Sequence, residues 1–422
     1  MSLDVCLYGA KIGELLPSGD GEYQLAYTPE TVERVAPGSV LLSHSLPVRA
    51  EPYDPDASRA YVEGLLPQGR RRRAIARELG LDPSDSYGLI AELGGNCLGA
   101  VSFGNPATLA ETAAPDTLAW LDEHELEELL QARPPRLFDP ANPRRMRFAL
   151  PGERHKLALI HDEQEDRWAW PQPGLPSTHI VKPEPPERPG LAANEHACSL
   201  AYRGLGLPVA HTEIRTIAGQ TCLVSKRFDR WGEGPEVERL HQETFAQALG
   251  IPPDAAKGRL SRGTPSLRES SELLRALGEE GAVRTLMRTT FCDLIVGCTE
   301  LRAANAALLF GNDGAMLAPF YDIASGEIYG DVRPRPVVFG APPAPLLVDL
   351  RYTIEFCGLD LQPGIVESVR VMGELCGALG EVGAQAREEG WSQRALDEAI
   401  QLAASRSLGF REEAEYLRPP GA

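Results

Sequence analysis

Three oxygen-bearing side chains in the second half of the chain have the order of a phosphoryl-transfer site. Glu300 and Asn305 are five positions apart, and Asp322 follows after two short segments with strand character. In enzymes that pass the ATP γ-phosphoryl group to a hydroxyl, one carboxylate accepts the hydroxyl proton. An amide five positions later and a second carboxylate hold the metal. The order therefore predicts Glu300 as the catalytic base, and Asn305 with Asp322 as metal ligands.

Two lysines and a glycine upstream are candidates for binding the phosphates. Lys182 lies in the alternating segment Thr178–Pro183, and Glu195 at the start of the next predicted helix is its natural counter-ion. Gly152 is expected between two strands, where backbone N–H groups can approach a phosphate, and Lys156 follows it. The ordinary alternatives are a strand lysine whose ammonium reaches water, and a plain hairpin with a surface lysine.

The segment Val224–Arg230 leads from the last strand of the first half into the second half. Such a connection can present backbone groups to an adenine edge. We therefore expect Lys226, Phe228 and Asp229 to line a nucleotide site. An interdomain linker that binds no ligand is the alternative.

The elements that must position these residues form a domain followed by two lobes. Alternating segments at 3–27, helical patterns at 70–79 and 86–93 and a glycine turn into a strand near 101 predict an α+β domain over 1–105. One helix at 117–130 belongs to a connecting region, 106–144. A β-rich lobe is expected over 145–235, with strands within 145–160, 176–183 and 220–228 and a helix at 194–204.

Residues 236–422 follow a 3.6-residue period and predict a mainly helical lobe. The expected helices lie at 240–249, 265–278, 281–297, 363–378, 380–388 and 391–405, with short strands at 306–310 and 315–321. A β-rich lobe next to a helical lobe indicates a cleft between them, where a small ligand binds.

Composition limits the classes of partner. The 422 residues contain 42 Lys and Arg against 60 Asp and Glu, and the resulting charge of −18 argues against direct binding of nucleic acid. Eight scattered cysteines, no signal peptide and no apolar run of membrane-spanning length predict a reduced, cytoplasmic protein without a membrane contact. The basic cluster Arg70–Arg73, with Arg77, is interpreted as a solvated helix face or as a contact to DNA or an acidic partner.

Motifs along nearly the whole chain resemble the HipA family of serine/threonine kinase toxins, bacterial proteins paired with HipB-type antitoxins. The matching segments are Leu3–Leu15, Leu42–Pro47, Gly64–Pro67, Gly94–Val101, Leu150–Gly152 with Lys156, Thr178–Lys182, Asn194–Glu195, Lys226–Arg230, Arg239–Gly250 and Pro319–Asp322. The resemblance implies a two-lobed protein-kinase-like α+β fold with an added N-terminal domain, and ATP and Mg²⁺ as cofactors. It also implies a translation-related protein substrate such as an aminoacyl-tRNA synthetase, a HipB-like helix-turn-helix partner, and DNA contact only through that partner.

The chain departs from the family at its catalytic loop. The family pattern Thr-Asp-x-His-x-Lys-Asn has Glu300, Arg302 and Ala304 in place of Asp, His and Lys. Ala149 replaces the serine of the family's regulatory autophosphorylation, and Lys226 replaces the usual hinge glutamate. Glutamate is one methylene longer than aspartate, and a misplacement of about 1 Å can cost on the order of 100-fold in rate. We therefore expect weakened phosphoryl transfer; the alternative is a pseudokinase that binds nucleotide or a helix-turn-helix partner and acts in transcriptional regulation or as a scaffold.

Overall fold

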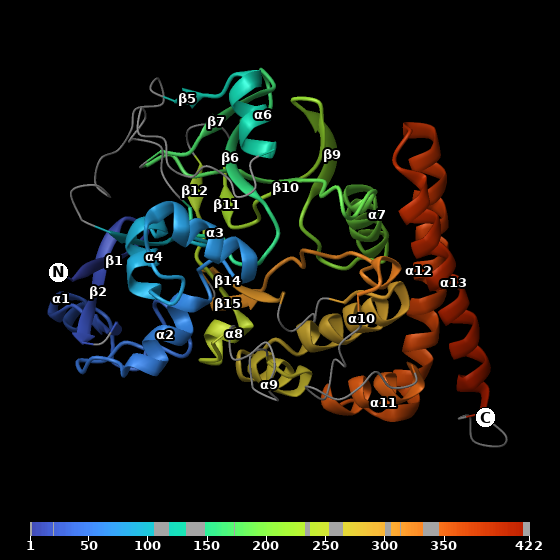
Figure 1. Cartoon of the computed structure of the whole chain (residues 1–422). Helices are drawn as coiled ribbons and strands as arrows, with labels where there is room; N and C mark the ends of the chain where they lie inside the picture. The colour runs from blue at the N-terminus through green and yellow to red at the C-terminus, as the bar shows by residue number, and fades with distance from the viewer. Residues whose placement is uncertain are drawn as a thin grey trace.

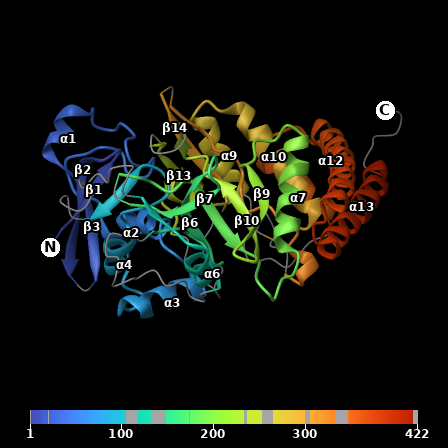
Figure 2. The same cartoon turned by 90° about the horizontal axis from the view of Figure 1, so that it is seen from above.

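The computed structural model describes residues 2–19, 21–104, 118–131, 148–172, 174–232, 237–252, 265–299, 305–312, 314–331 and 346–416. The predictions made for Glu300, Arg302 and Ala304 lie outside the described residues. Figure 1 shows an N-terminal domain, a central β-rich part and a helical part. In Figure 2 the N-terminal domain and the longest helices lie at opposite ends of the molecule.

The N-terminal domain is built on an antiparallel sheet with the order β3-β2-β1-β4. Its strands are β1 Leu3–Leu7, β2 Ala10–Gly19, β3 Glu22–Tyr27 and β4 Val101–Gly104. Its helices are α1 Pro29–Arg34, α2 Pro55–Glu63, α3 Gly69–Leu79 and α4 Ser86–Leu93. Asp85 caps α4, because its side chain accepts a hydrogen bond from the Gly88 N–H at 2.8 Å.

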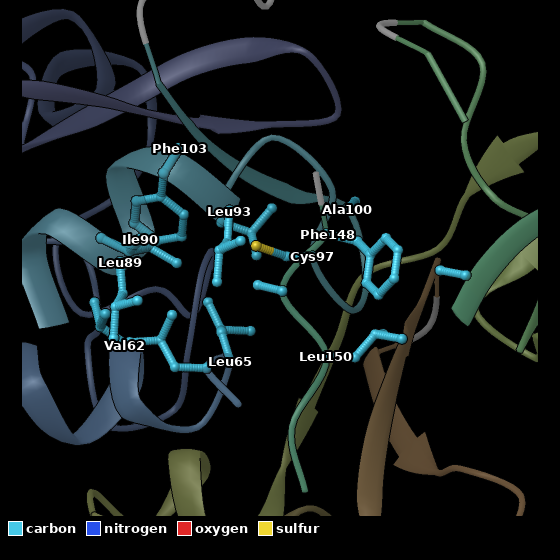
Figure 3. Close-up of a cluster of buried hydrophobic side chains, with 14 of the residues drawn as sticks. Val62, Leu65, Leu89, Ile90, Leu93, Cys97, Ala100, Phe103, Phe148 and Leu150 are labelled. Atoms are coloured by element: carbon cyan, nitrogen blue, oxygen red, sulfur yellow. The ribbon is translucent and has the colours of Figure 1, made fainter. Parts of the chain in front are cut away.

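The apolar core of this domain continues into the next part of the chain. Leu93, Cys97 and Phe103 are fully buried and belong to the same apolar cluster as Phe148 and Leu150, which come from beyond the connecting region (Figure 3). One continuous cluster of buried side chains runs from the N-terminal sheet through these residues into the next sheet. The domain is therefore packed directly against the segment that carries Gly152.

The central sheet has six strands in the order β5-β7-β6-β8-β10-β9. They are β5 Ala119–Trp120, β6 Leu157–Asp162, β7 Arg167–Trp170, β8 His179–Pro183, β9 Thr212–Ile217 and β10 Gln220–Lys226. Helix α6, Glu123–Gln131, follows β5, and α7, Leu191–Gly204, follows β8. Two predictions are wrong here: residues 119–120 are a strand where a helix was expected, and no strand forms over residues 148–151, so Gly152 does not lie in a hairpin.

The remaining elements form the helical lobe and small sheets. The helices are α8 Phe245–Ala248, α9 Leu267–Ala276, α10 Glu280–Val296, α11 Leu346–Phe356, α12 Leu361–Glu389 and α13 Gln393–Tyr416, with a 3₁₀ turn at Glu327–Tyr329. The strands are β11 Arg230–Trp231, β12 Glu238–Arg239, β13 Gln242–Thr244, β14 Ala307–Gly311 and β15 Gly314–Leu317. The hairpin β14–β15 confirms the two short strands predicted there.

Two helix predictions in this lobe need correction. The helix expected at 240–249 is a strand followed by a one-turn helix, because Thr244 caps α8 through a capping box with Gln247. The two helices expected at 363–378 and 380–388 are the single helix α12. Helix α7 joins the two lobes, since Ala197 packs with Val382, Ala386 and Leu396 of α12 and α13. Across the described residues, none of the helices combines the length and the apolar character needed to cross a membrane.

Candidate nucleotide site

The centre of the candidate site is an ion-pair cluster contributed by three separate elements. Lys182, the fourth of the five residues of β8, places its Nζ 2.6 Å from Oε1 of Glu195 on α7, and the same Nζ contacts the carboxylate of Asp322. The side chains of Lys182 and Glu195 are 11% and 3% exposed, so the pair is shielded from water. The sequence prediction that Glu195 is the counter-ion of Lys182 is confirmed. A fourth member, Arg154, was missed: its Nη1 lies 2.8 Å from Oε2 of Glu195.

The charges of this cluster stabilise one another. Burial alone would lower the pKa of Lys182, but the carboxylates of Asp322 and Glu195 outweigh it and raise that pKa. Burial alone would raise the pKa of Asp322, but Lys182, Lys156 and Arg154 hold it far below its usual range. Lys182 and Asp322 are therefore both charged at neutral pH, ready to contact a phosphate and a cation.

The backbone fixes the position of Asp322 from both sides. Asp322 itself has a left-handed φ of 55°, an unusual conformation for a residue other than glycine. Before it, the Phe320 N–H donates to the Pro208 carbonyl at 2.8 Å. After it, the Asn194 side chain both donates to the Ser325 carbonyl and accepts from its N–H, at 3.0 and 2.9 Å. Helix α7 thus positions Glu195 and the Asp322 segment together.

Asn305, the second predicted metal ligand, is half-buried and lies two residues before β14. Glu300 lies outside the described residues. Among the residues that the structure describes, no group of three or more His, Cys, Asp or Glu side chains is arranged to hold a metal ion. A site made from Asp322 and Asn305 would therefore need ligand oxygens from elsewhere. Such a site fits Mg²⁺, which is commonly held by one or two protein ligands together with phosphate oxygens and water.

Lys156 lies beneath the loop that contains Gly152. Lys156 is 8% exposed, and its Nζ lies 3.1 Å from the point where a Cβ on Gly152 would be placed. Gly152 has a φ of 93°, which favours glycine, and its carbonyl accepts from the Gln68 N–H at 3.2 Å. Burial is the main reason that the pKa of Lys156 falls to about 8; nearby Asp322 opposes the fall, and Lys182, Arg71 and Arg154 add to it. The surface-lysine alternative is wrong for Lys156.

The predicted hinge residues have different environments. The Lys226 ammonium forms a surface ion pair with Glu163 at 3.0 Å, and its backbone N–H donates to the His211 carbonyl. Phe228 stacks on Tyr321, with ring centroids 5.9 Å apart, and so contacts the residue next to Asp322. Phe228 is therefore joined to the Asp322 segment, whereas the Lys226 ammonium is not.

The carboxylate of Asp229 has protein partners of its own. It is buried and accepts from Arg227 at 2.7 and 2.9 Å, from Gln242 at 2.9 Å and from the Gly99 N–H at 2.7 Å. Burial alone would raise the pKa of Asp229, but the charges of Arg227 and Arg230 and the hydrogen bonds from Arg227 and Gly99 hold it far below its usual range. The contact with Gly99 ties the hinge to the N-terminal domain, so the structure brings Asp229 to that interface and not to the Lys182 cluster.

The basic cluster on α3 is only in part the solvated face that was predicted. Arg71 and Arg72 are 4% and 7% exposed, whereas Arg70 and Arg73 are exposed. Arg72 pairs with the buried Glu63 and also donates to Ser86 at 3.0 Å. Arg71 donates from Nη1 to the Leu150 carbonyl at 2.6 Å. A run of four arginines gives no period from which these two environments could be separated.

The chain is similar in sequence to known proteins along most of its length. Residues 3–104 match the HipA N-terminal domain, and residues 148–347 match the HipA-like C-terminal domain. The chain is 32% identical over 339 residues to Y4mE of Sinorhizobium fredii, which carries a provisional assignment as a kinase; the match covers 79% of each chain. It is 25% identical over 289 residues to the serine/threonine-protein kinase toxin HipA of Shewanella oneidensis, over 64% of each chain.

A solved structure has the same fold. It is the Shewanella oneidensis toxin–antitoxin complex of HipA, HipB and operator DNA, and its similar chain is 21% identical to this one. The superposition has a TM-score of 0.77 and covers 99% of this chain and 100% of the other. The predicted two-lobed α+β fold with an added N-terminal domain is confirmed, and the chain belongs to the HipA family.

Proposed function

We propose that the chain binds Mg–ATP at the Lys182–Glu195–Asp322 cluster and acts as a HipA-like serine/threonine protein kinase toxin. The observation that carries the proposal is the Lys182 Nζ, which contacts carboxylates from α7 and from the segment after β15 at once. A lysine–glutamate pair next to a metal-binding aspartate is the arrangement that phosphoryl-transfer enzymes of the kinase type require.

Each residue has a defined task in this proposal. Glu195 orients Lys182, whose ammonium contacts the phosphates, while Lys156 and the Gly152 loop cover them. Asp322 and Asn305 would hold Mg²⁺, which would neutralise the charge of the phosphates. Phe228 and the backbone of 226–229 contact the adenine. Glu300 accepts the proton of the substrate hydroxyl, at a rate reduced by its longer side chain and by Ala304 in place of a lysine.

The partners follow from the same family membership. We propose a HipB-like helix-turn-helix antitoxin as the binding partner, because the structure of similar fold comes from a complex with HipB. DNA would be contacted only through that partner, since the charge of this chain is −18. We propose a cytoplasmic, translation-related protein substrate such as an aminoacyl-tRNA synthetase.

Calorimetric titration with ATP tests the proposal, in Mg²⁺ and again in EDTA. Asp322→Asn removes the charged metal ligand but keeps the side-chain shape, so we expect at least tenfold weaker binding in Mg²⁺ and little change in EDTA. Asp397→Asn is the matched control, because Asp397 lies on the distant helix α13 in a surface pair with Arg387. Absence of binding to the natural chain at millimolar ATP and Mg²⁺ would contradict the proposal.

A pseudokinase is the second candidate, and the catalytic-loop residues Glu300, Arg302 and Ala304 favour it. Growth of cells that express the chain separates the two. Toxicity that is lost with Asp322→Asn, but kept with Asp397→Asn, supports an ATP-dependent toxin. Binding of ATP without toxicity or phosphoryl transfer supports a nucleotide-binding scaffold or transcriptional regulator.

A further inference from the structure

Arg71 is a buried cation of the N-terminal domain whose side chain extends beyond that domain. It lies in the first turn of α3, and its side chain reaches the segment 148–156. One of its amino groups, Nη1, donates to the Leu150 carbonyl at 2.6 Å. Its Nε and Nη2 are buried and have no hydrogen-bond partner among the described residues. These two groups form the edge of a guanidinium that binds an oxyanion with two parallel hydrogen bonds.

The neighbouring Arg72 is an example of a guanidinium in this helix that has a purely structural role. Arg72 is equally buried, but its donors are used by Glu63, Ser86 and the Pro83 carbonyl. No ion pair of Arg71 with a carboxylate is present in the described part of the chain. Burial lowers the pKa of Arg71 to about 10, so the side chain is still charged at neutral pH. The Leu150 carbonyl and the Phe148 ring, whose centroid lies 6.0 Å from the Arg71 guanidinium carbon, offset part of the cost of this buried charge, and an anionic ligand would neutralise it.

The position of Arg71, next to the Gly152 loop, indicates which anion it would bind. Helix α3 begins against the Gly152 loop, since the Gln68 N–H donates to the Gly152 carbonyl and Pro67 forms a parallel bridge with Gly152. Arg71 is close enough to Lys156 to lower its pKa. Both cations therefore lie at the loop that is proposed to cover the nucleotide phosphates.

The local charge balance is positive. The cations are Arg71, Arg154, Lys156 and Lys182, and the carboxylates are Glu153, Glu195 and Asp322. Glu153 lies over the first residue of α3, at Gly69, and Glu195 is already shared by Arg154 and Lys182. An excess of buried positive charge, with an unused two-donor edge, fits a phosphate group.

We propose that Arg71 is a phosphate-binding residue of the nucleotide site, contributed by the N-terminal domain, and that its Nε and Nη2 bind the terminal phosphates together with Lys156. The proposal rests on the nucleotide function proposed above. In this proposal the N-terminal domain contributes to the nucleotide site together with the two lobes, because Arg71, which completes the phosphate contacts, lies on α3.

Calorimetry with three probes tests this: tripolyphosphate, ATP and adenosine. Arg71→Gln should weaken binding of tripolyphosphate and of ATP at least tenfold, about 1.4 kcal/mol, and change adenosine binding less than twofold. Arg73→Gln is the matched control, because Arg73 lies on the same helix and is exposed; all three affinities should stay within twofold of the natural chain. Melting temperatures identify variants that have not folded.

The outcomes separate this proposal from the proposed function. If the natural chain binds tripolyphosphate but not ATP, the nucleotide function fails, and Arg71 is then judged by whether Arg71→Gln loses tripolyphosphate. If the natural chain binds ATP and Arg71→Gln leaves both phosphate probes within twofold, or weakens adenosine equally, the Arg71 proposal is overturned. Absence of tripolyphosphate binding to the natural chain also overturns it. Should Arg71→Gln not fold, Arg71→Lys keeps the charge without the two-donor edge, and an unchanged tripolyphosphate affinity would refute the proposal.

Discussion

Replacing Lys156 by methionine should stabilise the protein and weaken its binding of phosphate. Lys156 is buried at the Gly152 loop, and burial, with Lys182, Arg71 and Arg154 nearby, lowers its pKa from 10.5 to about 8 against the opposing effect of Asp322. At 1.36 kcal/mol per pH unit, the protonated side chain costs the folded state about 3 kcal/mol below pH 8. Lys156→Met removes the charge and keeps an unbranched side chain, so we expect a gain on that order.

The stability difference between Lys156→Met and the natural chain should change with pH, which a difference in packing alone would not do. Below pH 8 the lysine is protonated in the folded and the unfolded state, and the full cost is present. Between pH 8 and 10.5 the folded state releases the proton while the unfolded state keeps it, so the natural chain gains stability as the pH rises. The advantage of Lys156→Met should therefore be largest near pH 7 and shrink toward pH 10.5.

Differential scanning calorimetry of both chains from pH 7 to 10, with and without tripolyphosphate, measures both effects. Tripolyphosphate should raise the melting temperature of the natural chain more than that of Lys156→Met, because a ligand stabilises the folded state in proportion to its affinity for it. Lys226→Met is a suitable control, since Lys226 is 44% exposed and its ion pair with Glu163 lies at the surface. A lower melting temperature of Lys156→Met at pH 7, or an advantage that grows with pH, would refute the reasoning.

Two further predictions concern catalysis and its regulation. After incubation with ATP, mass spectrometry should find no phosphate on residues 146–156, because this segment contains no Ser, Thr or Tyr and Ala149 stands at the family's autophosphorylation position; phosphate there would contradict the assignment of the loop. The double change Glu300→Asp with Ala304→Lys should raise phosphoryl transfer, measured with radiolabelled ATP, since it shortens the base and restores a cation. A natural chain that transfers phosphate briskly, and loses rate with Glu300→Asp, would mean that Glu300 is an adapted working base.

The core of the site was predictable because its signals are local. Lys182 lies in a strand with clear alternation, Glu195 lies near the start of the following helix, and Asp322 follows a recognisable hairpin. The order strand, helix, hairpin fixes which ends of these elements can meet. Lys182, Glu195 and Asp322, although distant in sequence, therefore lie in contact as the sequence pattern predicted.

Other features depend on packing that a single sequence does not reveal. Helix α12 was expected to break near Gly380, but it continues through Gly383, where a Cβ would lie 2.7 Å from the Ile400 Cδ1 of α13. Gly383 allows the close approach of two helices, whereas a Cβ at Gly380, near the expected break, would meet nothing within 4 Å. The capping-box pattern of Thr244 and Gln247 was present in the sequence and marks a helix start after Thr244, but the 3.6-residue period led to a helix predicted from residue 240.

The N-terminal domain holds both sides of the candidate site, which changes how substitutions in that domain should be interpreted. Through Arg71 and Gln68 it binds the Gly152 loop, and through Gly99 it binds Asp229 beside Phe228 of the hinge. The shared apolar core makes these contacts part of one packed unit. Because buried networks tolerate little displacement, a change in the N-terminal domain acts on the loop and the hinge together. The candidate nucleotide site therefore depends on the N-terminal domain as well as on both lobes, and the central sheet carries only part of it.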